Sequence, residues 1–78
     1  MTNLEKYTKV FAETLSIDPS TAEGVTFQSV PQWNSVGHMI LIANMEMEFN
    51  IEFEPDDIIN YNSYQVGIDM LRNYGINF

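Results

Sequence analysis

Hydrophobic residues recur at intervals of three and four along much of the chain, which is the spacing of an amphipathic helix. The first such run consists of Leu4, Tyr7, Phe11 and Leu15. Thr2 or Asn3 can cap its start, and the pair Asp18 and Pro19 closes it off. The pattern predicts a helix over about residues 3 to 16.

The next segment, residues 17 to 32, keeps no period, because small and polar residues and Pro31 interrupt it. A loop this long in a compact domain is usually functional or held down by its own apolar residues. Its apolar residues are Val25, Phe27 and Val30, with Trp33 just beyond them. We expect these side chains to anchor the loop to the helices.

A strongly periodic run begins at Ser35 and ends near Phe49, and either Asn34 or Ser35 can cap it. The helix that it predicts has two apolar stripes on nearly opposite sides. One comprises Leu41, Ile42, Met45 and Phe49, and the other comprises Val36, Met39, Ile40, Ala43 and Met47. A surface helix needs one such stripe to reach a core. The second stripe is therefore either buried under the preceding loop or exposed beside Ser35 as a docking patch.

Two more helices follow. Pro55 with the carboxylates after it is typical of a helix opening, and it predicts a short helix over about residues 55 to 60. Asn62 with Gln65 three residues later resembles a capping box, and Gly75 ends the helix that it opens. The inward face of that last helix comprises Tyr64, Ile68 and Leu71. The whole pattern predicts an all-α fold with three longer helices, one short helix and a long loop between the first two.

Length and composition restrict the function. With 78 residues the chain forms one domain, residues 1 to 78, which is too small for the walls of a deep catalytic cleft. There is no cysteine, so disulfides, thiolate metal sites and a cysteine nucleophile are excluded. No signal peptide is recognisable and no apolar run approaches the ~18 residues that span a bilayer. We expect a cytoplasmic monomer that is not an enzyme.

The formal net charge of −8 comes from eleven acidic against three basic residues. Such a surface repels nucleic acid and anionic membranes, and it attracts basic protein surfaces. The same charge can also serve only to keep a small protein soluble. The carboxylates near residue 55 lack the spacing and the central glycine of a calcium-binding loop, so we expect no metal site.

The sequence Trp33-Asn34-Ser35-Val36-Gly37-His38-Met39 resembles the modification motif of the acyl carrier protein family, in which an Asp-Ser-Leu triplet opens the second helix. The resemblance continues through residues 45 to 53, which are similar to the acidic end of that helix. Residues 55 to 58 resemble the family's short third helix and residues 63 to 75 its last helix.

The resemblance implies a four-helix bundle of acyl carrier protein type. It implies that a phosphopantetheinyl transferase moves 4'-phosphopantetheine from coenzyme A onto Ser35, and that the arm's thiol carries cargo as a thioester. A loading ligase or transferase and enzymes that use the acyl group are the further partners implied. The docking residues that we assign are Val36, Met39, Ile40, Ala43, Glu46, Met47, Glu48, Asp56 and Asp57.

The chain departs from the family at several positions. Asn34 stands where Asp is usual, which keeps a capping oxygen but removes a negative charge. Val36 replaces the usual Leu, and Gly37 and Ile40 stand where acidic residues are frequent. The docking surface should therefore be more apolar than is usual in the family.

Other functions remain open at this point. Ser35 can be no more than a helix cap, in an unmodified acidic module that binds proteins through the same two-faced helix. A hydrolase with Ser35 as nucleophile needs His38 beside it and a third group to orient that histidine, and the sequence offers no such group. We expect His38 to be a half-buried helix residue or a neighbour of the arm. The sequence does not specify whether the cargo is fatty acyl, polyketide or aminoacyl.

Overall fold

Helices account for most of the chain in the computed structural model, which describes residues 1–78 and contains no strands. They are α1 (Asn3–Leu15), the 3-10 helix η1 (Pro19–Gly24), α2 (Ser35–Phe49), α3 (Pro55–Asn60) and α4 (Tyr64–Asn73). The all-α class and the four α-helices are confirmed. The segment expected to be an irregular loop contains η1 in addition, because Asp18 caps a turn that Pro19 opens.

Both ends of α1 lie within one residue of the predicted bounds. Thr2 is the cap, and it forms a reciprocal capping box with Glu5. These hydrogen bonds from Thr2 hold the pKa of the Glu5 carboxyl below its usual range. The helix ends at Leu15, one residue before the predicted end, because Ser16 adopts a left-handed conformation with φ of 55°.

The start of α4 was assigned wrongly. Ser63 is the cap, since its hydroxyl accepts a hydrogen bond from the Val66 N–H at 3.0 Å. Asn62 instead uses its backbone carbonyl, which accepts from the Phe27 N–H at 2.8 Å. At the other end Gly75 follows the helix with φ of 91°, as the predicted stop requires.

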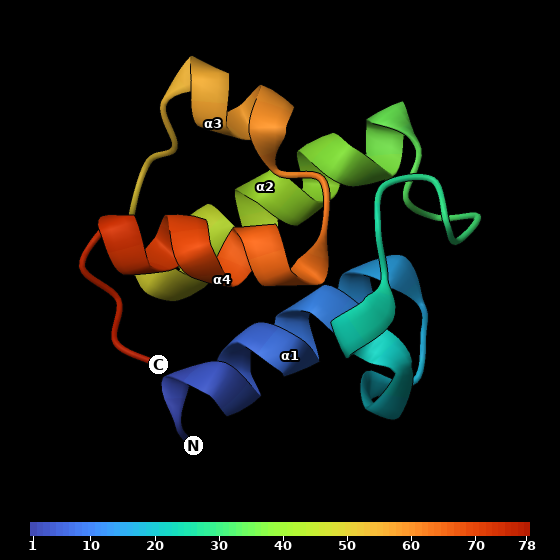
Figure 1. Cartoon of the computed structure of the whole chain (residues 1–78), viewed down its shortest axis with the longest axis horizontal. Helices are drawn as coiled ribbons and strands as arrows, with labels where there is room; N and C mark the ends of the chain where they lie inside the picture. Colours follow the sequence, from blue (N-terminus) through green and yellow to red (C-terminus); the bar gives the residue numbers. More distant parts are fainter.

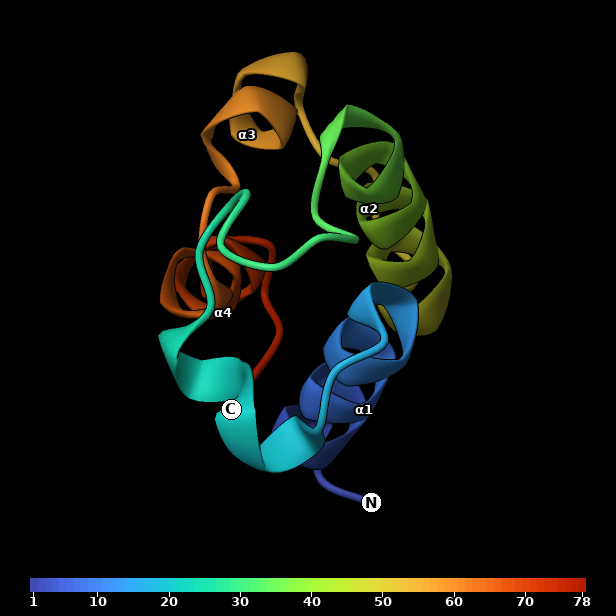
Figure 2. The same cartoon turned by 90° about the vertical axis from the view of Figure 1, so that its right-hand side faces the viewer.

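The α-helices enclose one core (Figures 1 and 2). Figure 2 shows α1 next to α2 on one side of the molecule, α4 on the opposite side and α3 at the end far from the termini. The two termini are neighbours, and the Asn3 side chain donates to the Asn77 carbonyl at 2.9 Å. The largest fully buried side chains are Trp33, Tyr7, Tyr61, Phe11, Leu15, Leu41, Met45 and Leu71.

Hydroxyl groups inside the core are paired. Tyr7 donates to the Tyr64 carbonyl at 2.7 Å, so Tyr61 must donate to the Tyr7 hydroxyl, also at 2.7 Å. Burial raises the pKa of both Tyr7 and Tyr61 well above the usual value. Gly67 of α4 makes this packing possible, because a Cβ there would collide with the Tyr7 hydroxyl and the Tyr61 ring. The network ties α1 to both ends of the α3–α4 connection.

The segment between η1 and α2 does not cover the second stripe of α2. It pairs with the α3–α4 connection. The backbone N–H of Tyr64 donates to the Val25 carbonyl at 3.0 Å, and an isolated β-bridge joins Thr26 to Ser63. Figure 2 shows it rising from η1 beside α4 and then crossing to the start of α2. Val25 and Trp33 are buried and serve as the expected anchors. The possibility that this loop buries the second stripe is therefore wrong.

Polar contacts attach α3, which has no fully buried residue. At its start the Tyr74 hydroxyl accepts from the Glu54 N–H at 2.8 Å and donates to the Asp57 carboxylate at 2.6 Å. Desolvation and the adjacent Asp57 carboxylate raise the pKa of Tyr74. In its middle the Ile58 carbonyl contacts the His38 imidazole.

No helix of the protein has both the length and the apolar character needed to cross a bilayer.

Candidate functional site

Ser35 is the first residue of α2 and is exposed to solvent. Asn34, not Ser35, is the cap, since its side-chain oxygen accepts from the Gly37 N–H at 2.8 Å. Its backbone carbonyl accepts from the His38 N–H, also at 2.8 Å. The Ser35 hydroxyl therefore does not cap the helix.

The helix start can accommodate an anion. Asn34 accepts hydrogen bonds from the backbone N–H groups of Gly37 and His38. The backbone N–H groups of Ser35 and Val36 have no acceptor inside the protein. No acidic residue lies in the first turn of α2. A phosphodiester on the Ser35 oxygen would meet free N–H donors and the positive end of the helix dipole there.

The loop before Ser35 lies unusually close to α2. A Cβ on Gly37 would overlap the backbone carbonyl oxygen of Gln32, so only glycine fits. The loop is closed by two backbone bonds, from Trp33 to the Val30 carbonyl and from Gln28 to the Trp33 carbonyl, each 3.1 Å. This close approach gives position 37 a steric reason to be glycine.

His38 is half-buried, as expected, and both of its ring nitrogens are engaged. Nδ1 accepts from the Trp33 indole N–H at 2.9 Å, and Nε2 lies 2.7 Å from the Ile58 carbonyl oxygen. Since neither nitrogen is available to take a proton from Ser35, the arrangement does not support the hydrolase alternative.

A pocket of about 330 Å³ opens beside Ser35, between α2 and α3. Its walls are Phe27, Ser35, His38, Met39, Ile58, Ile59, Tyr61 and Asn62. Sequence reasoning missed most of these residues, because they come from the loop, α2, α3 and the connection that follows it. The amphipathic pattern of α3 was too short to show that Ile58 faces this pocket.

The second stripe of α2 is exposed along its whole length. Val36 is 71%, Met39 54%, Ile40 50% and Met47 74% exposed, and Ala43 between them is exposed as well. The opposite stripe is inward, with Leu41, Ile42 and Met45 buried. Ile59 of α3, 77% exposed, adds an apolar side chain near Ser35 that the sequence did not reveal. The structure thus brings together Ser35, an apolar pocket and an apolar helix face.

The four acidic residues assigned to docking are not equivalent. Glu46 is half-buried, and its carboxylate accepts from the Phe53 N–H at 2.9 Å. Asp57 accepts from the Tyr74 hydroxyl. Only Glu48 and Asp56 are exposed and free of such bonds. Glu46 and Asp57 are therefore held by hydrogen bonds within the fold, and of the four only Glu48 and Asp56 have carboxylates free to contact a partner.

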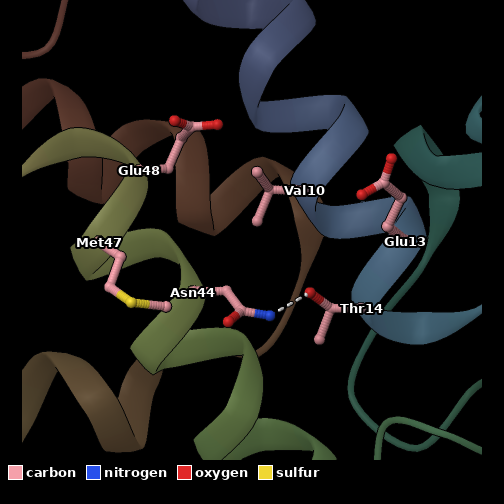
Figure 3. Close-up of a pocket in the computed structure, with 6 residues that line it drawn as sticks. All are labelled: Val10, Glu13, Thr14, Asn44, Met47 and Glu48. Carbon is pink, nitrogen blue, oxygen red and sulfur yellow. Dashed lines mark hydrogen bonds between the residues drawn. The ribbon is translucent and has the colours of Figure 1, made fainter.

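A second hollow, of about 410 Å³, lies between α1 and the far half of α2 (Figure 3). Its walls are Val10, Glu13, Thr14, Asn44, Met47 and Glu48. Asn44 donates to the Thr14 hydroxyl at 2.9 Å across it, so these two polar side chains satisfy each other. The Ser35 hydroxyl is not among its walls, and this hollow is the weaker candidate site.

No family model matches the sequence, and no curated protein is similar to it.

Proposed function

We propose that the chain is a freestanding acyl carrier protein that carries its cargo on 4'-phosphopantetheine attached to Ser35. The observation that carries the proposal is an exposed serine hydroxyl, free of capping, at the start of a helix with an apolar pocket and an apolar outer face beside it. The helix order, with α3 short and a long segment between α1 and α2, is consistent with a bundle of the acyl carrier protein type.

Attachment requires the Ser35 oxygen to attack the β-phosphate of coenzyme A. The new Oγ–P bond forms as the pyrophosphate P–O bond breaks, adenosine 3',5'-bisphosphate leaves, and the serine proton passes to the transferase or to solvent. The free N–H groups of Ser35 and Val36 stabilise the phosphodiester that results. The bound group would supply a thiol for thioester formation, which this cysteine-free chain lacks.

Partner enzymes would dock on α2. A phosphopantetheinyl transferase, a loading ligase or transferase and acyl-using enzymes must all reach Ser35 in turn. The exposed stripe offers anchors at the spacing of helix-in-groove recognition, namely Val36, Met39, Ile40, Ala43 and Met47. Glu48 and Asp56 add charge at its edges, and we assign the protein to the cytoplasm as a monomer.

The decisive experiment is the intact mass of the purified protein after incubation with coenzyme A and a broad-range phosphopantetheinyl transferase. The wild type should gain one phosphopantetheine group. Ser35→Ala should gain none, whereas Ser20→Ala, which changes another exposed serine, should be modified like the wild type. An unmodified wild type, or modification that persists in Ser35→Ala, would favour the alternative of an unmodified acidic interaction module.

Docking on the stripe has its own expected result. Met39→Ser should lower kcat/KM of the same transferase about five- to thirtyfold, because burying an exposed methionine in an interface stabilises the complex by roughly 1–2 kcal/mol. Leu4→Ser removes a comparably exposed apolar side chain from α1 and should leave kcat/KM unchanged. Equal effects of the two variants, measured by steady-state kinetics, would rule out docking on α2.

A further inference from the structure

The His38 imidazole has a fixed protonation pattern. The Trp33 indole nitrogen is only a donor, so Nδ1 of His38 must be its acceptor and must carry no proton. Nε2 then carries the ring proton and donates it to the Ile58 carbonyl at 2.7 Å. One chain of hydrogen bonds therefore joins the loop before Ser35, the first turns of α2 and the middle of α3.

Aromatic rings hold the imidazole on its remaining sides. Its centroid lies 5.6 Å from that of Phe27 and 6.2 Å from that of Tyr61, both edge to face. The Trp33 ring is nearly parallel to the imidazole, with 6.2 Å between the ring centroids. His38 lines the pocket beside Ser35, whereas Trp33 does not and has no exposed surface. The imidazole thus separates the pocket from the core.

The geometry points to His38 as the residue that closes the inner end of this pocket and so limits the cargo to short, apolar acyl groups. This assignment rests on the proposed carrier function. At about 330 Å³ the pocket is at the small end of ligand sites, which span ~300–1,000 Å³. An imidazole fixed by two hydrogen bonds and three rings cannot swing aside without breaking them, so its position sets the depth.

The inner walls also select against polar cargo. Both nitrogens of His38 are engaged, and the Tyr61 hydroxyl donates to Tyr7 inside the core. A charged or hydroxylated acyl end would lose its water and find no partner among these groups. Ser35 and Asn62 supply polar atoms in the remainder of the lining. A short aliphatic or aromatic acyl group fits these conditions, and an aminoacyl group does not.

Three variants test the assignment. His38→Ala removes the inner wall. His38→Gln retains it, because the glutamine amide can accept from the Trp33 indole and donate to the Ile58 carbonyl. His38→Ala alone leaves the buried Trp33 indole N–H without an acceptor, which can prevent folding. The double variant Trp33→Phe with His38→Ala has no such N–H and replaces His38→Ala in that case.

The measurement uses holo protein loaded with straight-chain acyl groups of four to twelve carbons. Hydrolysis of the thioester is followed at mildly alkaline pH for each length. In the wild type and in His38→Gln, only short chains should be protected, by about three- to tenfold over the longest chain. In His38→Ala or the double variant, the longest protected chain should be longer by at least two carbons.

Two results would overturn the role of His38 while leaving the carrier function intact. One is the same length profile in the wild type and in the His38→Ala variants. The other is a nitrogen NMR spectrum of the unmodified protein that shows the proton on Nδ1 instead of Nε2. Absence of any phosphopantetheine on wild-type Ser35 would instead overturn the proposed function itself.

Discussion

Replacement of Gly67 by alanine should destabilise the fold by about 2–4 kcal/mol, although alanine is the better helix former by ~1 kcal/mol. Gly67 lies in the middle of α4, against the Tyr7 hydroxyl and the Tyr61 ring. An added methyl group must push these side chains apart. Overpacking of this kind typically costs ~1–3 kcal/mol, and each buried hydroxyl bond that breaks adds ~1 kcal/mol. The steric effect therefore exceeds the gain in helix propensity.

Thermal unfolding followed by circular dichroism measures the effect, and a fall in Tm of about 10–20 °C is expected for a domain of this size. Gly24→Ala is the matched control. That glycine has open space around its Cβ position and an ordinary backbone conformation, so its replacement should change stability by less than ~0.5 kcal/mol. Equal stability of the two variants would contradict the tight packing of Gly67 against Tyr7 and Tyr61.

Replacement of Gly37 by alanine should have the second largest effect and should reach the functional site. The new methyl group would overlap the Gln32 carbonyl, which is backbone and can move only with the loop before Ser35. Displacing that loop disturbs the Asn34 cap and the Trp33 to His38 hydrogen bond. We expect a loss of about 1–3 kcal/mol in unfolding free energy and at least a fivefold lower kcat/KM for phosphopantetheine transfer.

A control must separate lost stability from a displaced loop. Gln65→Gly weakens α4 by up to ~1 kcal/mol through helix propensity alone and leaves the loop in place. It should lower Tm without changing the transfer kinetics. If Gly37→Ala is modified as fast as Gln65→Gly, the loop does not position Ser35. Gly37→Asp introduces an acidic residue of the kind that the resemblance to acyl carrier proteins would favour there, and it should be at least as damaging as Gly37→Ala because it also adds a Cβ.

These two glycines illustrate what could not be read from the sequence. A glycine within a helical pattern normally suggests only lower helix propensity. Whether a neighbouring group occupies the space of its Cβ depends on residues far away in the chain, such as Tyr7 and Tyr61 for Gly67. The sequence therefore marked both positions as helical, and only the packing revealed why neither tolerates a side chain.

The candidate site divides in the same way. Local spacing located Ser35 at a helix start and separated the two stripes of α2, because rotation per residue around a helix is fixed. By residue type either Asn34 or Ser35 could cap the helix. The hydrogen bond from the Gly37 N–H to the Asn34 side chain shows that Asn34 is the cap. The hydrogen bonds of Glu46 and His38 join residues 7 and 20 positions apart, and the pocket joins residues as distant as Phe27 and Asn62. A local pattern holds no information about such contacts.

The sequence by itself determined the helices, their inward faces and the serine that opens α2, since these follow from backbone periodicity and from capping chemistry at neighbouring residues. Only the tertiary structure decided that the outer stripe of α2 stays exposed. Periodicity gives the direction of a side chain around its own helix but not what lies opposite. Here the preceding loop pairs with the α3–α4 connection through Val25, Phe27 and Tyr64, so no segment remains to cover that stripe.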